Sequence, residues 1–259
     1  MNEEYIIVTG ATGGIGSHLC RHLVSKGKNL ILVARNEESL QTLKTNLKES
    51  QANANILSVA ADFEEHSSLS TVADLVDKES FSVSGLVVMP PQIPPTEGCL
   101  PASGVWDDIF KRSFIGPLEL IKNCLPHLEK SKGSKIVIVS GISSAQVLSH
   151  YATSNVLRTA WLGQAKTMAA ALGPKGVHVN TLSLGGVMTD KYHDKLSKKA
   201  TSNGRTFDEQ MLKEVDNVPL RKYATTEDVA NAIEGLLSDF SNHFTGHNFI
   251  CDGGFTRAY

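Results

Sequence analysis

The chain has 259 residues, of which 41% are hydrophobic and 20% are charged, and its formal net charge at pH 7 is −2. This length is enough for a large core in one α/β domain, and no Pro/Ser-rich linker or low-complexity tract divides the chain. Because the charge is nearly balanced and no basic run stands out, nucleic acid and anionic membrane surfaces are excluded as expected partners.

Cysteine usage and the amino-terminal segment indicate the cellular compartment. The four cysteines are scattered, without the paired spacing of metal ligands, at Cys20, Cys99, Cys124 and Cys251. We therefore expect reduced thiols in a cytoplasmic protein and no metal site. There is no charged-then-apolar leader and no apolar run of about 18 residues, so neither a secretion signal nor a membrane span is expected.

The amino-terminal segment carries the clearest motif. A β-branched run at residues 5–9 breaks into a glycine-rich segment at residues 10–16, and apolar residues behind it recur at helical spacing. The order strand, tight turn, helix predicts a site where backbone N–H groups approach a pyrophosphate at the positive end of a helix. The residues expected to bind the dinucleotide here are Gly10, Thr12, Gly14, Ile15 and Gly16.

Strand-like and helix-like patterns alternate along the rest of the chain. Short apolar runs predict strands at residues 29–33, 56–60, 85–89, 135–140, 177–182 and 247–251. Helical spacing predicts helices at residues 36–50, about 69–76, about 105–130, about 151–172 and 226–238. This alternation predicts an α/β fold, with one Rossmann-like, doubly wound parallel sheet over residues 1–259 and helices on both faces.

Two segments interrupt this alternation. Residues 90–101 are too rich in proline for regular structure, so we expect a loop at the carboxyl end of the fourth strand. Residues 189–219 are polar and charged with a helical pattern. An insertion of this length at a strand's carboxyl end is typical of a lid or substrate wall, and the alternative is a solvated helical pair with no part in the chemistry.

The end of the second strand indicates which dinucleotide binds. An acidic residue there would bind the ribose hydroxyls of NAD, but the sequence is Val-Ala-Arg-Asn, so Arg35 can pair with a 2′-phosphate. NADP(H) is therefore expected, with NAD and an ordinary surface arginine as the alternative. Asp62 is expected to accept from the adenine amino group, or else to cap a helix. Further cofactor contacts are expected at the other strand ends, from Asn36, Phe63, Pro90, Gly186, Val187 and Thr189.

These motifs resemble those of the short-chain dehydrogenase/reductase family over essentially the full chain. The matching positions are the Thr-Gly-(x)3-Gly-Ile-Gly turn at residues 9–16, Asp62, Val179-Asn180 and Asp252-Gly253-Gly254. The resemblance implies a Rossmann-like subunit, a nicotinamide cofactor and a homotetramer or homodimer.

The catalytic residues that the family implies are not retained. Ungapped counting from Val179-Asn180 places the family's Asn, Ser, Tyr and Lys at Ser113, Gly141, Ser154 and Arg158, with Ser140 beside Gly141. The resulting Ser-x-x-x-Arg, in place of Tyr-x-x-x-Lys, resembles a divergent, ketoacyl reductase-like branch. Serine is a far weaker acid than tyrosine, and arginine stays protonated, but Arg158 can still hydrogen-bond the nicotinamide ribose.

Tyr151 offers an alternative electrophile. If the helix begins by Tyr151, then Tyr151, Ser154, Asn155 and Arg158 share one helical face. The Tyr-x6-Arg spacing resembles the Tyr-x6-Lys of enoyl reductases, which need an electrophile at the conjugated carbonyl oxygen. Tyr151, Ser154 or Ser140 can supply it. The alternatives are that Tyr151 is a packed aromatic and that neighbouring His150 is structural rather than a proton donor.

Together these patterns predict an NADP(H)-dependent oxidoreductase. Its substrate is a small ketone, 3-oxoacyl-like, or a conjugated enone, and its candidate catalytic residues are Tyr151, Ser154, Arg158 and Ser140. The alternative is a non-catalytic dinucleotide-binding sensor or assembly subunit.

Overall fold

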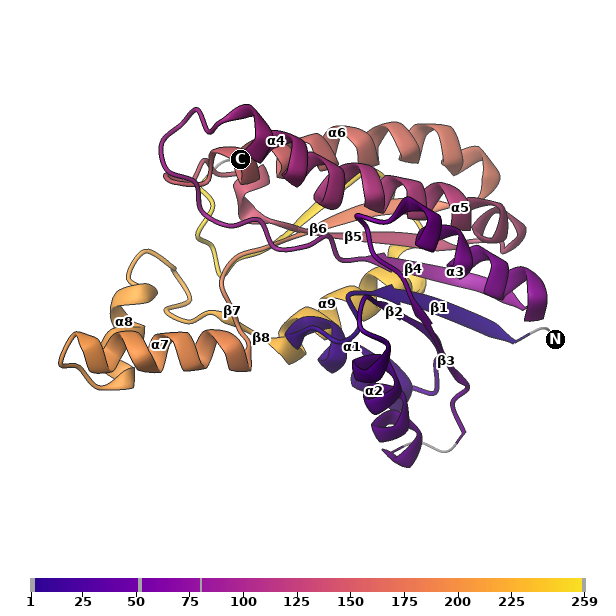
Figure 1. Cartoon of the computed structure of the whole chain (residues 1–259), viewed down its shortest axis with the longest axis horizontal. Coiled ribbons are helices and arrows are strands. Elements are labelled where there is room, and N and C mark those ends of the chain that lie inside the picture. Colours follow the sequence, from indigo (N-terminus) through magenta and orange to yellow (C-terminus); the bar gives the residue numbers. More distant parts are fainter. Residues whose placement is uncertain (1–2, 51–52, 80, 258–259) are drawn as a thin grey trace.

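Parallel strands form the central sheet of the computed structural model, which describes residues 3–50, 53–79 and 81–257 (Figure 1). The sheet has seven strands in the order β3-β2-β1-β4-β5-β6-β9, all paired in parallel. Their bounds are β1 Glu4–Thr9, β2 Asn29–Ala34, β3 Ile56–Ala60, β4 Ser82–Val88, β5 Lys135–Gly141, β6 His178–Leu184 and β9 Asn248–Cys251. The predicted doubly wound parallel sheet is confirmed.

Helices cover both faces of this sheet, as Figure 1 shows. One layer holds α1 (Gly14–Ser25), α2 (Glu37–Ser50) and α9 (Thr226–Leu237). The other holds α3 (His66–Glu79), α4 (Ser103–Phe110), α5 (Gly116–Lys130) and α6 (Ala152–Leu172). Within the described residues, no helix has both the length and the apolar character needed to cross a membrane.

The alternation of side chains along each strand builds one core per face. In β1, Ile7 packs into the cluster that includes α3, α5 and α6 residues, whereas Ile6 and Val8 pack into the cluster that includes α1, α2 and α9 residues. A strand buried on both faces appears in the sequence as a continuous run of apolar residues, and such runs were enough to predict these strands.

The strand order reverses between β1 and β4, and ligands of open α/β sheets bind outside the carboxyl ends of the strands at such a switch. Thr9, at the end of β1, accepts a hydrogen bond at Oγ1 from the backbone N–H of Met89, just past β4, at 2.8 Å. This bond holds the two strand ends together beneath the crevice.

The helix predicted at residues 105–130 contains a π-helical turn at Lys111–Ile115 between α4 and α5. The physical reason is Pro117, which has no N–H to donate to the carbonyl of Ser113 four residues earlier. The freed carbonyl instead accepts from the indole Nε1 of Trp161 in α6, at 3.0 Å.

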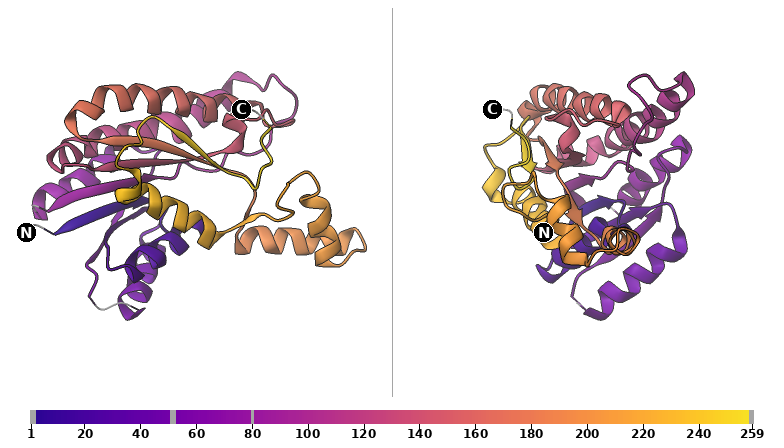
Figure 2. Two further views of the ribbon diagram at one scale, coloured as in Figure 1. Left: turned by 180° about the vertical axis from the view of Figure 1, so that it is seen from behind. Right: turned by 90° about the vertical axis from the view of Figure 1, so that its left-hand side faces the viewer.

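The predicted helical insertion is present as α7 (Asp190–Ser202) and α8 (Phe207–Glu214). It leaves and rejoins the body through the paired short strands β7 (Val187–Met188) and β8 (Ala224–Thr225). The hydroxyls of Thr189 and Thr206 cap the two helices, and Thr206 forms a capping box with Glu209. Figure 2 shows this lobe standing off from the layers, at the end of the molecule away from the amino terminus.

His127 makes the stability of the fold depend on pH. It is buried on α5, with Nε2 3.8 Å from Asp77 Oδ2. Burial lowers the pKa of His127 and outweighs the opposing effect of Asp77. Below the ordinary pKa of histidine, the unfolded chain therefore binds more protons than the folded protein does. The free energy of unfolding must fall as the pH drops through this range.

We expect chemical denaturation to reveal this loss between about pH 7.5 and about pH 5.5. The variant His127→Gln should lose less stability than the wild type over that range. His243→Gln, on an exposed histidine, is the control and should behave as the wild type. Equal losses in the wild type and His127→Gln would contradict the prediction.

Candidate active site

The glycine turn after β1 forms one wall of the crevice. Gly10 has a left-handed backbone with φ near +60°, and its carbonyl accepts from the N–H of Gly13 at 2.9 Å. A Cβ on Gly16 would overlap the carbonyl of Gly10. Only glycine lets α1 start this close to the strand, so the turn leaves the helix amino terminus facing the crevice.

The opposite wall is the segment after β6. A Cβ on Gly14 would lie 3.2 Å from the Cβ of Thr189, so the first turn of α1 and the start of the lobe meet. The structure thus brings Gly14, Val187 and Thr189 to one edge of the sheet, although they are distant in sequence. Thr189 Oγ1 accepts from the N–H of Tyr192, at 3.3 Å.

Arg35 and Asn36 follow β2, and both are exposed. Arg35 makes no hydrogen bond or ion pair among the described residues. Asn36 accepts from the N–H of Ser39 at 2.7 Å, so its side chain caps α2. The side chain of Asn36 therefore cannot bind the cofactor through Oδ1 without giving up the helix cap. The sequence held a sign of this cap, because asparagine is a preferred residue just before a helix.

Asp62 lies in the loop between β3 and α3. Its Oδ1 accepts from the N–H of Glu64 at 3.0 Å, and α3 begins only at His66. The alternative that Asp62 caps this helix is therefore wrong. Phe63, beside it, contacts α5 through its backbone, because a Cβ on Gly116 would overlap the Phe63 carbonyl.

The loop after β5 meets α6 through a pair of serines. Ser154 Oγ and Ser143 Oγ are 2.9 Å apart, and both residues are buried. Ungapped counting had pointed to Gly141 and Ser140 instead. The difference arises because a 3-10 turn at Ile142–Ser144 brings Ser143 against the helix. Ser140 stays in β5 and is buried, and its hydroxyl has no hydrogen-bond partner in the part of the chain that the structure describes.

Arg158 lies one helical turn beyond Ser154 and against the same loop. Its Nη1 donates to the carbonyl of Val139 at 3.4 Å, and Gly141 packs against its Nε. Burial lowers the pKa of Arg158 to about 10. No carboxylate among the described residues pairs with it, so the site holds a desolvated cation with free donors.

The start of α6 and the contacts of Asn155 differ from the predicted shared face. The helix begins at Ala152, so Tyr151 is the residue that precedes it. The amide of Asn155 exchanges hydrogen bonds with the backbone of Leu148, at 3.2 and 3.0 Å, and so braces the preceding loop. The prediction that Asn155 accompanies Ser154 and Arg158 is therefore wrong.

The segment before α6 is held by the proline-rich loop. Thr96 donates its N–H to the carbonyl of His150 at 2.7 Å and accepts at Oγ1 from the N–H of Ala152 at 3.0 Å. His150 itself has a left-handed backbone with φ near +61°. These contacts support the structural alternative for His150 and fix the backbone on both sides of Tyr151.

Aromatic and charged side chains connect the lobe to the crevice. The ring of Tyr223 packs on Gly186 and lies 5.6 Å from the ring of Tyr192. Burial raises the pKa of Tyr223, and the nearby Tyr151 adds to that rise. Lys199 donates to the carboxylate of Glu214 at 2.6 Å and joins α7 to α8.

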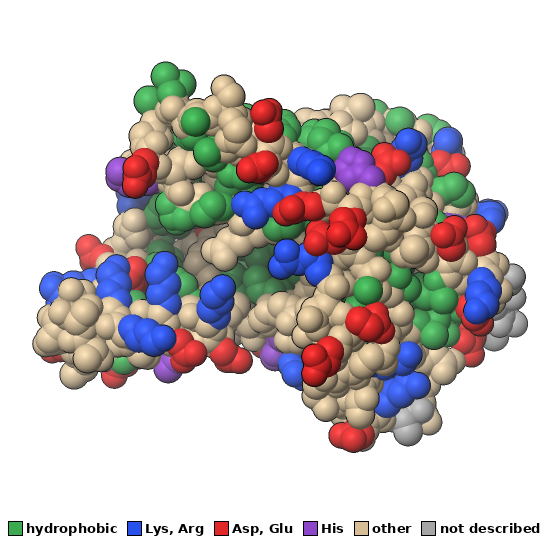
Figure 3. Space-filling model, viewed as in Figure 1, with side chains coloured by type: hydrophobic (Ala, Val, Ile, Leu, Met, Phe, Trp, Pro, Cys, Tyr) green, Lys and Arg blue, Asp and Glu red, His purple; other side chains and the backbone are tan. Residues whose placement is uncertain are grey.

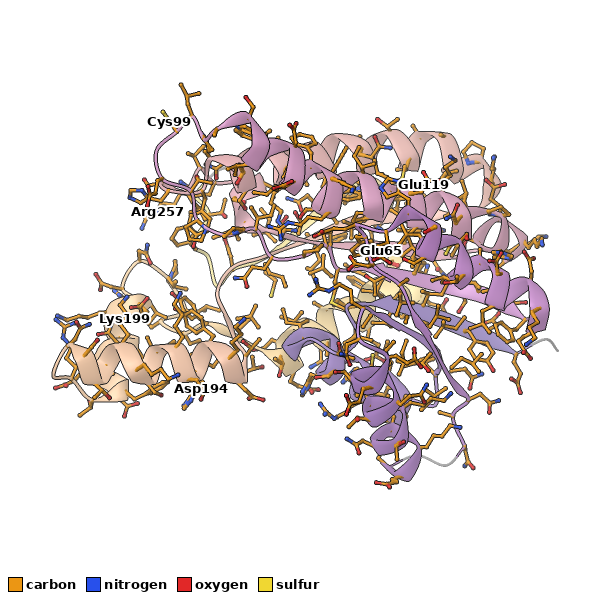
Figure 4. The ribbon with its side chains drawn as sticks, in the orientation of Figure 1. Glu65, Cys99, Glu119, Asp194, Lys199 and Arg257 are labelled. Atoms are coloured by element: carbon orange, nitrogen blue, oxygen red, sulfur yellow. The ribbon has the colours of Figure 1, made fainter. Side chains whose placement is uncertain are left out.

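Figure 3 shows a hollow between this lobe and the body, with Lys and Arg side chains along the lobe's edge. Figure 4 places Cys99 and Arg257 on the body side and Lys199 on the lobe side. Leu100, next to Cys99, is 88% exposed. The tip of the loop at residues 90–101 is therefore apolar in part, whereas the lobe's edge is basic.

Comparisons with known proteins show which family the chain resembles. A family model described as enoyl-(acyl carrier protein) reductase matches residues 10–256. Dehydrogenase/reductase SDR family member 4 of Mus musculus is 25% identical over 257 residues, which cover 98% of this chain and 88% of that protein. The NADPH-dependent reductase BacG of Bacillus subtilis is 20% identical over 265 residues, which cover all of both chains.

Solved structures share the fold. An NADPH-bound short-chain oxidoreductase of Pseudomonas aeruginosa PAO1, described as containing an atypical catalytic centre, has a TM-score of 0.89 at 22% identity and covers 98% of this chain and 97% of its own. L-sorbose reductase of Gluconobacter frateurii, complexed with NADPH and L-sorbose, has a TM-score of 0.92 at 21% identity. The match covers 100% of this chain and 98% of the sorbose reductase chain. Because the family model spans nearly the whole chain, the chain belongs to the short-chain dehydrogenase/reductase family, a family of oxidoreductases.

Proposed function

We propose that the chain binds NADP(H) and transfers a hydride between its nicotinamide and a carbonyl compound, either a ketone, 3-oxoacyl-like, or a conjugated enone. The observation that carries this proposal is the glycine turn, which lets α1 start so close to β1 that an added Cβ on Gly16 would overlap the carbonyl of Gly10. Backbone N–H groups at the start of α1 are suited to hold the pyrophosphate there. When bound, the nicotinamide supplies the hydride.

The choice of NADP(H) rests on Arg35. It is an exposed cation without a partner among the described residues, at the strand end where NAD enzymes carry an acid. The printed names of several relatives and neighbours include NADPH, which supports this choice. Asp62 has one carboxylate oxygen left to accept from the adenine amino group, since among the described residues only Oδ1 receives a backbone N–H.

Arg158 takes the position that the family's lysine has. Its buried guanidinium has more donors than the single carbonyl of Val139 uses, so it is suited to hydrogen-bond the ribose of the nicotinamide. Because its charge is desolvated, it also stabilises negative charge that develops on a carbonyl oxygen nearby.

The hydrogen bond to the substrate oxygen would come from the Ser154–Ser143 pair, with Tyr151 as the other candidate. A serine hydroxyl is too weak an acid to be a strong proton donor, but it stabilises an oxyanion well. Reduction of a conjugated enone needs mainly such an electrophile, which favours the enone over the ketone. The α7–α8 lobe would then act as the lid.

The test is loss of nicotinamide absorbance when NADPH is offered a panel of ketones and enones. We expect Ser154→Ala to lower kcat by about 100-fold, the usual cost of one oxyanion donor, with little change in NADPH affinity. If the serine pair donates to the substrate oxygen, Tyr151→Phe should lower kcat less than Ser154→Ala does. If Tyr151 is the donor, Tyr151→Phe should lower kcat more than Ser154→Ala does. Thr167→Ala, on an exposed position of the same helix, is the control. Wild-type rates in both site variants would contradict these roles.

A second candidate is a non-catalytic dinucleotide-binding subunit. It is favoured by the loss of all four family catalytic residues, at Ser113, Gly141, Ser154 and Arg158. It predicts tight NADPH binding without turnover on any member of the panel, and biological activity that survives Ser154→Ala and Arg158→Ala. Turnover of one substrate would exclude it.

A further inference from the structure

Arg112 is a second unpaired cation near the crevice, and the proposed reaction leaves it without a role. It belongs to the π-helical turn Lys111–Ile115, a distortion often found at functional sites. Its Nε is buried, and among the described residues this atom has no hydrogen-bond partner and no carboxylate pairs with the guanidinium. Burying a polar donor without a partner is costly, so the arrangement indicates a ligand that repays the cost.

The helix face of Arg112 gives the direction of its side chain. Gly116, four residues later, lies on the same face and packs on the backbone of Phe63. The opposite face of this turn packs against α6, since the carbonyl of Ser113 accepts from the Trp161 indole and the ring of Phe114 lies 4.9 Å from the Trp161 ring. Arg112 therefore faces the loop of Asp62 and Phe63, at the adenosine end of the groove.

We propose that Arg112 binds the adenosine half of the dinucleotide, with its planar guanidinium against the face of the adenine ring. The proposal rests on the proposed binding of NADP(H). A guanidinium stacks on aromatic planes, so a contact with the adenine ring stabilises the group as a whole and offsets the cost of the unpaired Nε, which an ammonium group cannot match. Asp62 would accept from the adenine edge while Arg112 covers its face.

This role differs from that of Arg35. The exposed Arg35 is suited to a phosphate on the ribose, and its contribution depends on that phosphate. A contact between Arg112 and the adenine ring is shared by every adenine nucleotide and is absent from a nucleotide without adenine. The two arginines therefore recognise different parts of one molecule, and their variants are separable with nucleotide fragments.

The experiment measures dissociation constants by calorimetry for the full chain with NADPH, NADH, 2′,5′-ADP, 5′-ADP and reduced nicotinamide mononucleotide. We expect Arg112→Ala to weaken the four adenine nucleotides by about 10-fold each and to leave the mononucleotide unchanged. Arg112→Lys should not restore binding, because it keeps the charge but loses the plane. Arg35→Ala should weaken only NADPH and 2′,5′-ADP.

Lys111→Ala, an exposed cation in the same turn, is the matched control and should bind as the wild type. Wild-type binding by Arg112→Ala would overturn the proposal, as would full rescue by Arg112→Lys or a loss confined to nucleotides with a 2′-phosphate. If Arg112→Ala does not fold, Arg112→Lys and Arg112→Gln decide by the same comparison. A wild-type chain that binds neither NADPH nor NADH would instead overturn the proposed function.

Discussion

Replacing Gly14 with valine is expected to weaken NADPH binding by at least about 100-fold while leaving the fold intact. Gly14 is exposed and opens α1, so a larger side chain does not disturb the core. Its Cβ would already lie 3.2 Å from the Cβ of Thr189, and the two γ carbons of valine would enter the space where a pyrophosphate reaches the helix N–H groups. Calorimetry with NADPH measures the loss, and thermal unfolding checks the fold.

The matched control for Gly14→Val is Gly104→Val. Gly104 also lies in the first turn of a helix and is exposed, but nothing lies within 4 Å of an added Cβ. The control should bind NADPH as the wild type does. Binding by Gly14→Val within about 3-fold of the wild type would show that the nucleotide does not reach the start of α1 beside Gly14, since a clash of this kind costs far more.

The parts of the fold predictable from sequence are those set by local chemistry. Strands buried on both faces are continuous apolar runs, as in β1 and β5. The tight turn after β1 has glycine at positions 10 and 16, where its backbone conformation and close packing require it. The cap at Asn36 had a local signal as well, because an asparagine just before a helix marks its start, although the sequence analysis predicted Asn36 only as a cofactor contact. These features depend on residues only a few positions apart.

The parts that could not be predicted depend on contacts distant in sequence. The π-helical turn requires both Pro117 and the indole of Trp161, which takes over the freed carbonyl of Ser113. The serine that meets Ser154 is Ser143 because a 3-10 turn advances the loop, which an ungapped count does not detect. The contact between Ser143 and Ser154 therefore could not be predicted from the sequence, and the roles of the candidate site residues stay predictions.

Arg158 and Arg112, which are proposed to contact opposite halves of the cofactor, share one energetic feature. Each buries part of a guanidinium, and neither has a carboxylate partner among the described residues. Such groups lower the stability of the folded chain, since a buried cation without a partner loses hydration and gains little. Proteins retain unfavourable features of this kind where function needs them, so a variant should change stability and activity in opposite directions.

Arg158→Met is therefore expected to lower kcat/KM by about 100- to 1000-fold and to raise the melting temperature of the free protein by about 3 °C. Methionine keeps much of the volume but removes the desolvated charge. Burial lowers the pKa of Arg158 to about 10, so the guanidinium binds its proton more tightly in the unfolded chain than in the folded one. At neutral pH Arg158 is charged in both states, and the whole loss of folding stability caused by burying that charge is therefore present. The measurements are steady-state kinetics on the best substrate of the panel and thermal unfolding with and without NADPH.

Arg158→Lys is the control for charge, because the family carries lysine at this position and an ammonium can also bind the ribose. It should recover most of the activity that Arg158→Met loses. Saturating NADPH should stabilise the wild type more than Arg158→Met, since the guanidinium gains partners only when the ribose is bound. A methionine variant that is both fully active and less stable than the wild type would mean that Arg158 serves only to hold the loop after β5 through the Val139 carbonyl.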